Sequence, residues 1–209
     1  SLYPAYRAFV SQGGTKTDDK NIYYDFAYST EKLQPRDNLG KDTDISISLA
    51  KNEREAFQLA IYSDKADKKI SISCSDFSNS SGESIPVRIF NERFVEVPAY
   101  GINKFTDMYP DGLIPVSENN SIELTENELT IFYIETVSEK ETPAGEYTAN
   151  LKIFDENDKE ILSKEIKSEV RDFVLEEKYF SESAMGLFSN TFWELMGYEA
   201  AGYGGNGAL

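Results

Sequence analysis

Apolar residues recur at every second position through most of the chain between residues 44 and 175. The runs Ile45 to Leu49 and Phe57 to Ile61 are two examples. A period of two places apolar side chains on one face of a β-strand, whereas a helix needs a period near 3.6. Further runs lie at residues 70–74, 85–90, 94–97, 129–135, 147–154 and 162–170. The pattern predicts about eight strands, spaced as in an all-β, antiparallel β-sandwich of the jelly-roll or immunoglobulin-like kind.

Turn-forming residues separate these runs. Asp155 to Lys159 holds Asp and Asn residues that favour tight reversals, and it predicts a hairpin. Thr142 to Gly145 predicts a second turn, because Pro fixes one φ angle and Gly supplies freedom for the next bend. Tyr100 to Pro115 contains several Gly and Pro residues among aromatics, so we interpret it as a long ordered loop rather than a strand.

The two ends of the chain differ from its middle. Residues 1–43 form an N-terminal extension with one expected strand, Ile22 to Tyr28, packed on the sandwich at residues 44–178. Residues 179–209 suggest a buried strand near Ala184 to Phe188 and a short helix from Thr191 to Tyr198. We interpret this short α/β segment as the start of a following, truncated barrel domain or as a C-terminal extension.

The charge of the chain limits its partners. With 209 residues, 40% of them hydrophobic, the chain can bury a sizeable core, yet its net charge is −16. A polyanionic surface repels phosphate, so we expect neither nucleic acid nor an anionic membrane as a partner. No run approaches the roughly 20 apolar residues that cross a bilayer, and we expect no membrane insertion. No leader precedes Ser1, so we expect a soluble chain whose export signal has been removed.

The residue types present exclude several kinds of chemistry. The sequence has no histidine, which removes Ser-His-Asp and Cys-His catalysis and imidazole metal sites. Its one cysteine, Cys74, lies in an alternating run and is interpreted as a small buried hydrophobe. A composition rich in Asn, Ser, Thr, Tyr and Lys, with so little Cys, suits an exported bacterial protein at the cell surface or outside the cell.

Two acidic clusters have both a functional and a structural interpretation. Glu53 and Glu55 could form an acid/base pair, but a strand-entering turn favours Glu53 and Arg54 as residues that fix the loop, with Gln58 bonding within the sheet. Oxygen ligands at the 155–158 turn (Asp155, Asn157 and Asp158) could hold calcium, although the twelve-residue loop spacing is missing and a plain hairpin is favoured. We expect no cofactor otherwise.

Tyrosine is the residue type that most suggests a ligand. The chain has thirteen, and a tyrosine ring can stack on the apolar face of a sugar while its hydroxyl bonds to sugar hydroxyls. Our candidate glycan contacts lie in terminal or loop segments: Tyr24, Tyr28, Tyr100, Tyr109 and Asp111. The alternative is that Tyr24, Phe26 and Tyr28 simply fill one face of a sheet.

Four short segments carry a family resemblance. Ile47 to Leu59 has an Asn-Glu, a short gap and a Phe-Gln entering a strand. Pro98 to Pro115, which contains Asp111-Gly-Leu-Ile-Pro115, has a Pro-Asp-x-Leu-x-Pro character. Thr142 to Thr148 has a Pro-Gly-x-Tyr turn, and Val170 to Phe173 is a strand leading outward. In this order they resemble the β-sandwich that precedes the catalytic barrel in glycoside hydrolase family 123 and its relatives of unknown function.

The resemblance implies a parent enzyme rather than an active chain. Proteins of that family are exported, and the best known release N-acetylgalactosamine with an Asp-Glu pair in the barrel. No position here matches that pair, so no catalytic residue is carried over. The expected function is a non-catalytic accessory sandwich that supports an intramolecular barrel and contributes to glycan binding. The alternatives are a stand-alone carbohydrate-binding module that uses exposed tyrosines, and an adhesion or protein-interaction sandwich.

Overall fold

A computed structural model of the chain describes residues 13–40, 42–98, 107–117 and 121–176. The chain divides into two compact units, Ser1–Leu175 and Glu176–Leu209, and every described residue except Glu176 belongs to the first. The strand and helix expected between Ala184 and Tyr198 therefore lie outside the described residues, as does Tyr100.

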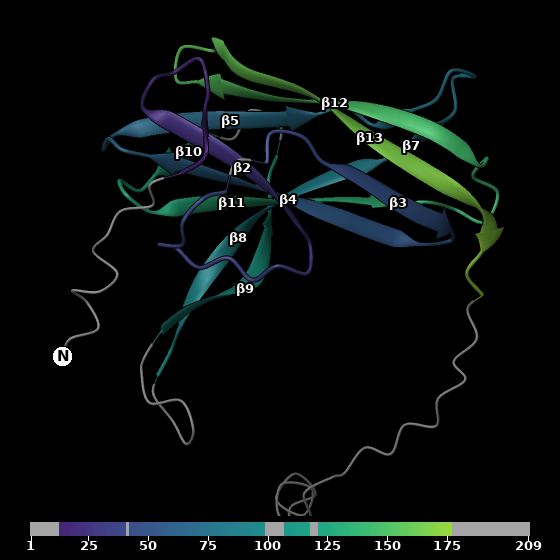
Figure 1. Ribbon diagram of the computed structural model, residues 1–209, viewed down its shortest axis with the longest axis horizontal. Helices are drawn as coiled ribbons and strands as arrows, with labels where there is room; N and C mark the ends of the chain where they lie inside the picture. Colours follow the sequence, from purple (N-terminus) through teal and green to yellow (C-terminus); the bar gives the residue numbers. More distant parts are fainter. Residues whose placement is uncertain (1–12, 41, 99–106, 118–120, 177–209) are drawn as a thin grey trace, which may run out of the picture. The chain divides into compact units, whose positions relative to one another are not determined.

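The described residues form a two-layer β-sandwich (Figure 1). In spatial order, the first sheet contains β1 (Thr15–Lys16), β2 (Ile22–Tyr28), β4 (Arg54–Ser63), β11 (Leu129–Val137), β8 (Val87–Val97) and β9 (Asp107–Pro115). The second contains β10 (Ile122–Leu124), β5 (Lys68–Cys74), β12 (Gly145–Asp155), β13 (Glu160–Val174) and β3 (Ser46–Lys51). Two short strands, β6 (Phe77–Ser78) and β7 (Ser84–Ile85), extend it beside β12. These residues include no helix, which confirms the all-β class.

Most neighbouring strands are antiparallel, as the alternation predicts, but β3 runs parallel to β13. The difference arises at the corner between β3 and β4, where the chain leaves one sheet and enters the other. β3 thus forms an edge of the second sheet while β4 lies inside the first. Strand β2 is also a full member of the first sheet, since it pairs with β4 from Ile22 to Tyr28.

The core lies between the two inner faces. Phe57, Leu59 and Ile61 of β4 point into it and are fully buried, as the alternation predicts. The opposite face of β4 is buried as well, since Leu39 packs against Ala60 from the segment that follows β2. A strand covered on both faces loses the polar half of its pattern.

The carboxylate of Asp25 fastens this covering segment to the sheet. It accepts hydrogen bonds from the N–H groups of Gly40, at 2.5 Å, and Asp42, at 2.8 Å. Desolvation raises the pKa of Asp25, although these backbone hydrogen bonds act in the opposite direction. Local hydrogen bonds therefore hold the segment where its apolar side chains reach the sheet.

The expectation of a loop from Tyr100 to Pro115 is wrong for its second half, because Asp107–Pro115 forms strand β9. β9 is the edge of the first sheet and pairs with β8 alone among the described strands. An edge strand tolerates proline because one side of its backbone needs no partner, which accommodates Pro110. The register shifts opposite Gly112, whose φ of 108° suits an irregularity in the pairing.

Beyond the sandwich, β8 and β9 continue as a two-stranded arm (Figure 1). Residues Val87–Asn91 of β8 pair with β11, and β8 pairs with β9 from Phe90 onward, so the residues of β8 after Asn91 pair with β9 alone among the described strands. The two predicted runs at 85–90 and 94–97 are therefore joined, with the later one in the arm rather than over the core.

Candidate functional site

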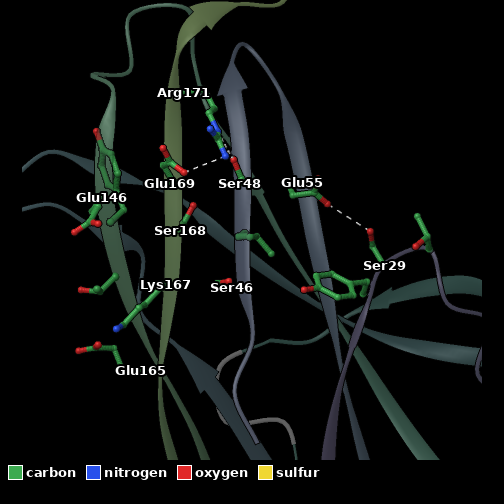
Figure 2. Close-up of a pocket in the computed structure, with 15 residues that line it drawn as sticks. Ser29, Ser46, Ser48, Glu55, Glu146, Glu165, Lys167, Ser168, Glu169 and Arg171 are labelled. Carbon is green, nitrogen blue, oxygen red and sulfur yellow. Dashed lines mark hydrogen bonds and ion pairs between the residues drawn. The ribbon is translucent and has the colours of Figure 1, made fainter. Parts of the chain in front are cut away.

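The described surface is hollowed by a groove of about 820 Å³ beside edge strand β3. We call it the β3 groove. Tyr28, Ser29 and Glu55 bound it on one side, and Ser48, Lys167 and Arg171 bound it on the other. It thus joins the end of β2 and the start of β4 in one sheet to β3 and β13 in the other (Figure 2).

The β3–β4 corner fixes one end of the groove. Asn52 has a φ of 63°, a left-handed conformation that Asn tolerates well, and this reverses the chain. The carboxylate of Glu53 accepts a hydrogen bond from Ala50 N–H at 2.5 Å, and the Ser138 hydroxyl donates to Ala50 O at 2.7 Å. Glu53 thus holds the turn, as its structural interpretation predicts.

Arg54 was expected to fix the loop, but its side chain instead links neighbouring strands. Its Nη1 donates to Glu135 Oε2 at 2.7 Å, and Arg88 pairs with the other oxygen of the same carboxylate. The Glu135 side chain is 6% exposed, so the two guanidinium groups compensate a buried charge across β4, β11 and β8. Nothing in the sequence indicated that Glu135, eighty-one positions from Arg54, would be this partner.

The groove wall beside β2 is anchored by Gln58. Its Nε2 donates to Tyr28 O at 2.7 Å and to Glu31 O at 2.8 Å, so it bonds to the neighbouring strand, as expected, and also to the turn after it. Tyr28 N–H donates to Glu31 Oε1 at 3.0 Å, and Ser29 Oγ lies 3.4 Å from Glu55 Oε1. The backbone beneath the Tyr28 ring is thus held on both sides.

The opposite wall is a row of polar side chains from β13 and β3 (Figure 2). Arg171 Nε donates to Ser48 Oγ at 2.9 Å, and its Nη2 lies 3.2 Å from Glu169 Oε2. Lys167 is paired in register with Ser46, so a cation and a hydroxyl stand side by side. This wall offers hydrogen-bond donors and acceptors in fixed positions on sheet strands.

The floor of the groove includes two largely buried side chains, Tyr147 and Ser168. The Tyr147 hydroxyl donates to Pro143 O at 2.9 Å, which ties the start of β12 to the predicted turn before it. Burial of the side chain raises the pKa of Tyr147. Ser168 Oγ is buried and has no hydrogen-bond partner.

The structure separates the candidate glycan contacts. Tyr24 is 3% exposed and packs edge-to-face on Phe26, so its ring fills the core and has no free face for a sugar. Tyr28 is 58% exposed in the β3 groove, whereas Tyr109, 37% exposed, and the exposed Asp111 belong to the arm. β2 and β9 stand four strand positions apart in the sheet, about 19 Å at ordinary spacing. No common platform joins Tyr28 and Tyr109.

Two groups of large apolar side chains are exposed. We call Phe173, Val174 and Leu175, at the end of β13, the exit patch; Phe173 is 55% exposed. The second group lies on β8 and β9: Val95, Val97, Tyr109 and Leu113 on the arm, and Ile114 at its base. Exposed groups of large apolar side chains are typical of interaction surfaces, and the exit patch is such a group.

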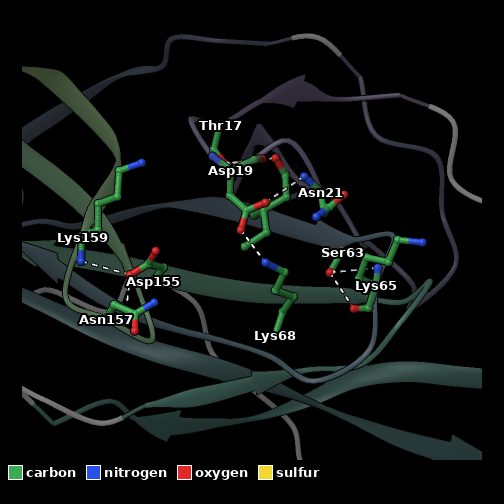
Figure 3. A network of polar contacts seen from close by, with 10 residues as sticks. Thr17, Asp19, Asn21, Ser63, Lys65, Lys68, Asp155, Asn157 and Lys159 are labelled. Atoms are coloured by element: carbon green, nitrogen blue, oxygen red, sulfur yellow. Dashed lines mark hydrogen bonds and ion pairs between the residues drawn. The ribbon is translucent and has the colours of Figure 1, made fainter.

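The 155–159 turn forms the predicted hairpin between β12 and β13 (Figure 3). Asp155 Oδ1 accepts hydrogen bonds from Asn157 N–H at 2.8 Å and Lys159 N–H at 3.0 Å. Nearby, Lys68 Nζ donates to Asp19 Oδ2 at 2.6 Å. The described residues contain no group of three or more His, Cys, Asp or Glu placed to hold a metal, and calcium stays a prediction.

No protein-family model and no curated protein matches the chain. Among solved structures, it is similar to a family 123 glycoside hydrolase from Clostridium perfringens, with a TM-score of 0.61 and 12% identity over 74% of this chain. The chain spans 28% of that protein's length. At this identity the similarity concerns the fold alone. It agrees with the fold that the family resemblance implies, while membership of the family stays a prediction.

Other similar structures include the CooA pilin of enterotoxigenic Escherichia coli, with a TM-score of 0.38 and 15% identity over 70% of this chain and 96% of the pilin. The MyfA fimbrial subunit of Yersinia enterocolitica has a TM-score of 0.33 and 13% identity over 71% of this chain and 96% of its own. TM-scores below 0.5 carry no argument about this chain. Among the described residues, no helix is long and apolar enough to span a membrane.

Proposed function

We propose that this chain is the non-catalytic β-sandwich module of an exported glycoside hydrolase and packs against a catalytic barrel of the same polypeptide. The observation that carries the proposal is the similarity of fold, at a TM-score of 0.61, to an enzyme of which this chain spans 28%. That enzyme hydrolyses glycolipid glycans, so we infer glycans as the substrate class of the parent protein.

The exit patch supports the expected partner. Phe173, Val174 and Leu175 are large, apolar and exposed where β13 leaves the second sheet. Asn52 Nδ2 donates to Leu175 O at 2.7 Å, and Leu175 N–H donates to Lys51 O at 2.9 Å, so the corner holds this backbone in place. A fixed apolar patch suits a permanent contact with a neighbouring domain better than contact with water.

This proposal is tested by two substitutions in the intact native protein and in the 209-residue chain. Phe173→Ser with Leu175→Ser removes apolar surface that docking would bury. In the chain alone we expect the free energy of unfolding to change by less than about 0.5 kcal/mol, because the side chains are exposed. In the intact protein we expect a loss of about 2 kcal/mol, since burying the exposed half of a large apolar side chain contributes about 1 kcal/mol.

Val95→Ser with Val97→Ser, on the arm, is the matched control because these side chains are also exposed. Chemical denaturation of both proteins gives the comparison. Backbone amide exchange at residues 173–175 should also be slower in the intact protein. Equal effects of the exit-patch substitutions in the two proteins, with equal exchange rates, would contradict docking at this surface.

A stand-alone carbohydrate-binding module is the second candidate, and the β3 groove is the observation that favours it. It holds an exposed aromatic ring opposite a polar wall within one cavity. Glycan binding that is as tight in the chain alone as in the intact protein would favour this candidate.

A further inference from the structure

We propose that the β3 groove binds a neutral oligosaccharide, with the Tyr28 ring as its stacking platform and the Ser48–Arg171 wall as its hydrogen-bonding partner. The inference deepens the proposed function and rests on it for the class of ligand. The residues of the site come from the groove itself.

Tyr28 is the first element of the site. It is the most exposed of the large apolar and aromatic side chains in the described residues, at 58%, yet it lies at a fixed place on the last residue of β2. Gln58 holds its carbonyl at 2.7 Å, and Glu31 accepts from its N–H at 3.0 Å. An aromatic ring on a fixed backbone loses little conformational entropy when a ligand stacks on it.

The polar wall is the second element. Ser48 Oγ and Glu169 orient the Arg171 guanidinium, whose side chain is still 54% exposed. A guanidinium group has five N–H donors in a planar fork, so those not engaged by Ser48 and Glu169 can reach adjacent sugar hydroxyls.

The charge of the groove decides which glycans fit. Four carboxylates line it (Glu55, Glu146, Glu165 and Glu169), against two cations, Lys167 and Arg171, which gives a formal charge of 2 − 4 = −2. The chain as a whole carries −16. Sialylated, sulfated or uronic acid glycans would meet repulsion at long and short range. Neutral sugars present hydroxyls that both donate and accept, which the serines, carboxylates and Arg171 can match.

The size of the groove suits a short oligosaccharide. Its volume of about 820 Å³ lies within the range of about 300–1,000 Å³ that is usual for small-molecule sites. The tyrosine and the arginine belong to different sheets, so a ligand that contacts both must cross the edge strand β3. A single sugar would engage one wall, whereas a chain of two or three could engage both.

The test is calorimetric titration of the 209-residue chain with neutral trisaccharides and tetrasaccharides, including ones ending in N-acetylgalactosamine, and with sialyllactose as the acidic probe. We expect saturable binding of at least one neutral glycan and none of sialyllactose. Tyr28→Ala should weaken binding at least about fivefold, since an aromatic stack contributes about 1 kcal/mol. Tyr28→Phe keeps the ring and should retain affinity within about twofold, and Arg171→Met should weaken it.

Tyr109→Ala is the matched control, because Tyr109 is an exposed tyrosine on the arm and should leave affinity unchanged. Thermal unfolding of each variant shows whether it is folded, and the exposure of Tyr28 predicts little change. The inference is overturned if no neutral glycan binds at about 10 mM, a concentration that reveals even millimolar affinity. Full affinity in Tyr28→Ala, equal binding of sialyllactose, or binding of an extended peptide in place of glycan would also overturn it. Each result is independent of amide exchange at the exit patch, so failure of this site and failure of barrel docking are distinguishable.

Discussion

Gln58 offers a direct test of how the groove wall is held. It is 1% exposed, and its side-chain N–H groups donate to Tyr28 O and Glu31 O, while its Oε1 is buried without a partner. Gln58→Met keeps the length of the side chain and removes both hydrogen bonds. We therefore expect weaker attachment of residues 29–31 without a cavity in the core.

The magnitude follows from these contacts. Two neutral hydrogen bonds contribute about 1 kcal/mol each, and removing the unpaired Oε1 offsets about 1 kcal/mol of that loss. The expected loss in the free energy of unfolding is about 1 kcal/mol, or about 3 °C in the unfolding midpoint for a domain of this size. Leu59 follows Gln58 in β4 but points into the core and is fully buried, so Leu59→Ala should lower the free energy of unfolding by about 2–5 kcal/mol.

Urea unfolding gives the free energies, and amide exchange gives the local effect. In Gln58→Met the amides of residues 29–31 should exchange faster while those of β11 and β12 do not change. A loss as large as that of Leu59→Ala, or unaltered exchange at residues 29–31, would refute the view that Gln58 acts by anchoring this wall.

Two further predictions concern ionisable groups. Burial acts to raise the pKa of Asp19, but hydrogen bonds from Lys68 and Asn21 N–H outweigh it, so the pKa lies below the ordinary 3.8. A carboxyl group with a lowered pKa stabilises the fold above about pH 4, and this contribution is lost as the pH falls through the pKa of the folded state. In urea titrations, the difference in the free energy of unfolding between wild type and Asp19→Asn should therefore become smaller below about pH 4. A difference that does not change with pH would contradict this. Burial, with Asp76 nearby, raises the pKa of the Cys74 thiol to about 12, so iodoacetamide at pH 8 should label the native chain far more slowly than the unfolded one, and equal rates would contradict this.

The alternation of apolar residues was sufficient to predict most of the long strands, because side-chain period is a local property. We could assign Phe57, Leu59 and Ile61 to the core without knowing which residues they contact. The burial of Ala60 and Tyr62 on the other face was not predictable in this way, because it depends on Leu39 reaching back from a separate segment. The strand at Pro110 was missed for a related reason, since proline is acceptable only if the strand is at an edge, and edge position is a property of the whole sheet.

The groove was less accessible to sequence reasoning than the fold. Its walls come from strands far apart in the sequence, and Arg171 meets Ser48 across 123 positions. One signal was present: Glu165, Lys167, Glu169 and Arg171 alternate with buried residues along β13, which marks a charged outer face. Tyr24 and Tyr28 belong to the same alternating run, so the sequence pattern treats them alike. Tyr28 is exposed because it is the last residue of β2, whereas Tyr24 lies inside the strand and is buried.

If this sandwich is a non-catalytic module of a glycoside hydrolase, sugar release should depend on the rest of the polypeptide, and an activity assay measures that dependence. The intact native protein and the 209-residue chain should be compared on chromogenic N-acetylgalactosaminides and on neutral glycolipid glycans. We expect sugar release by the intact protein and none by the chain. Turnover by the chain alone, or no release from any of these substrates by the intact protein, would contradict it.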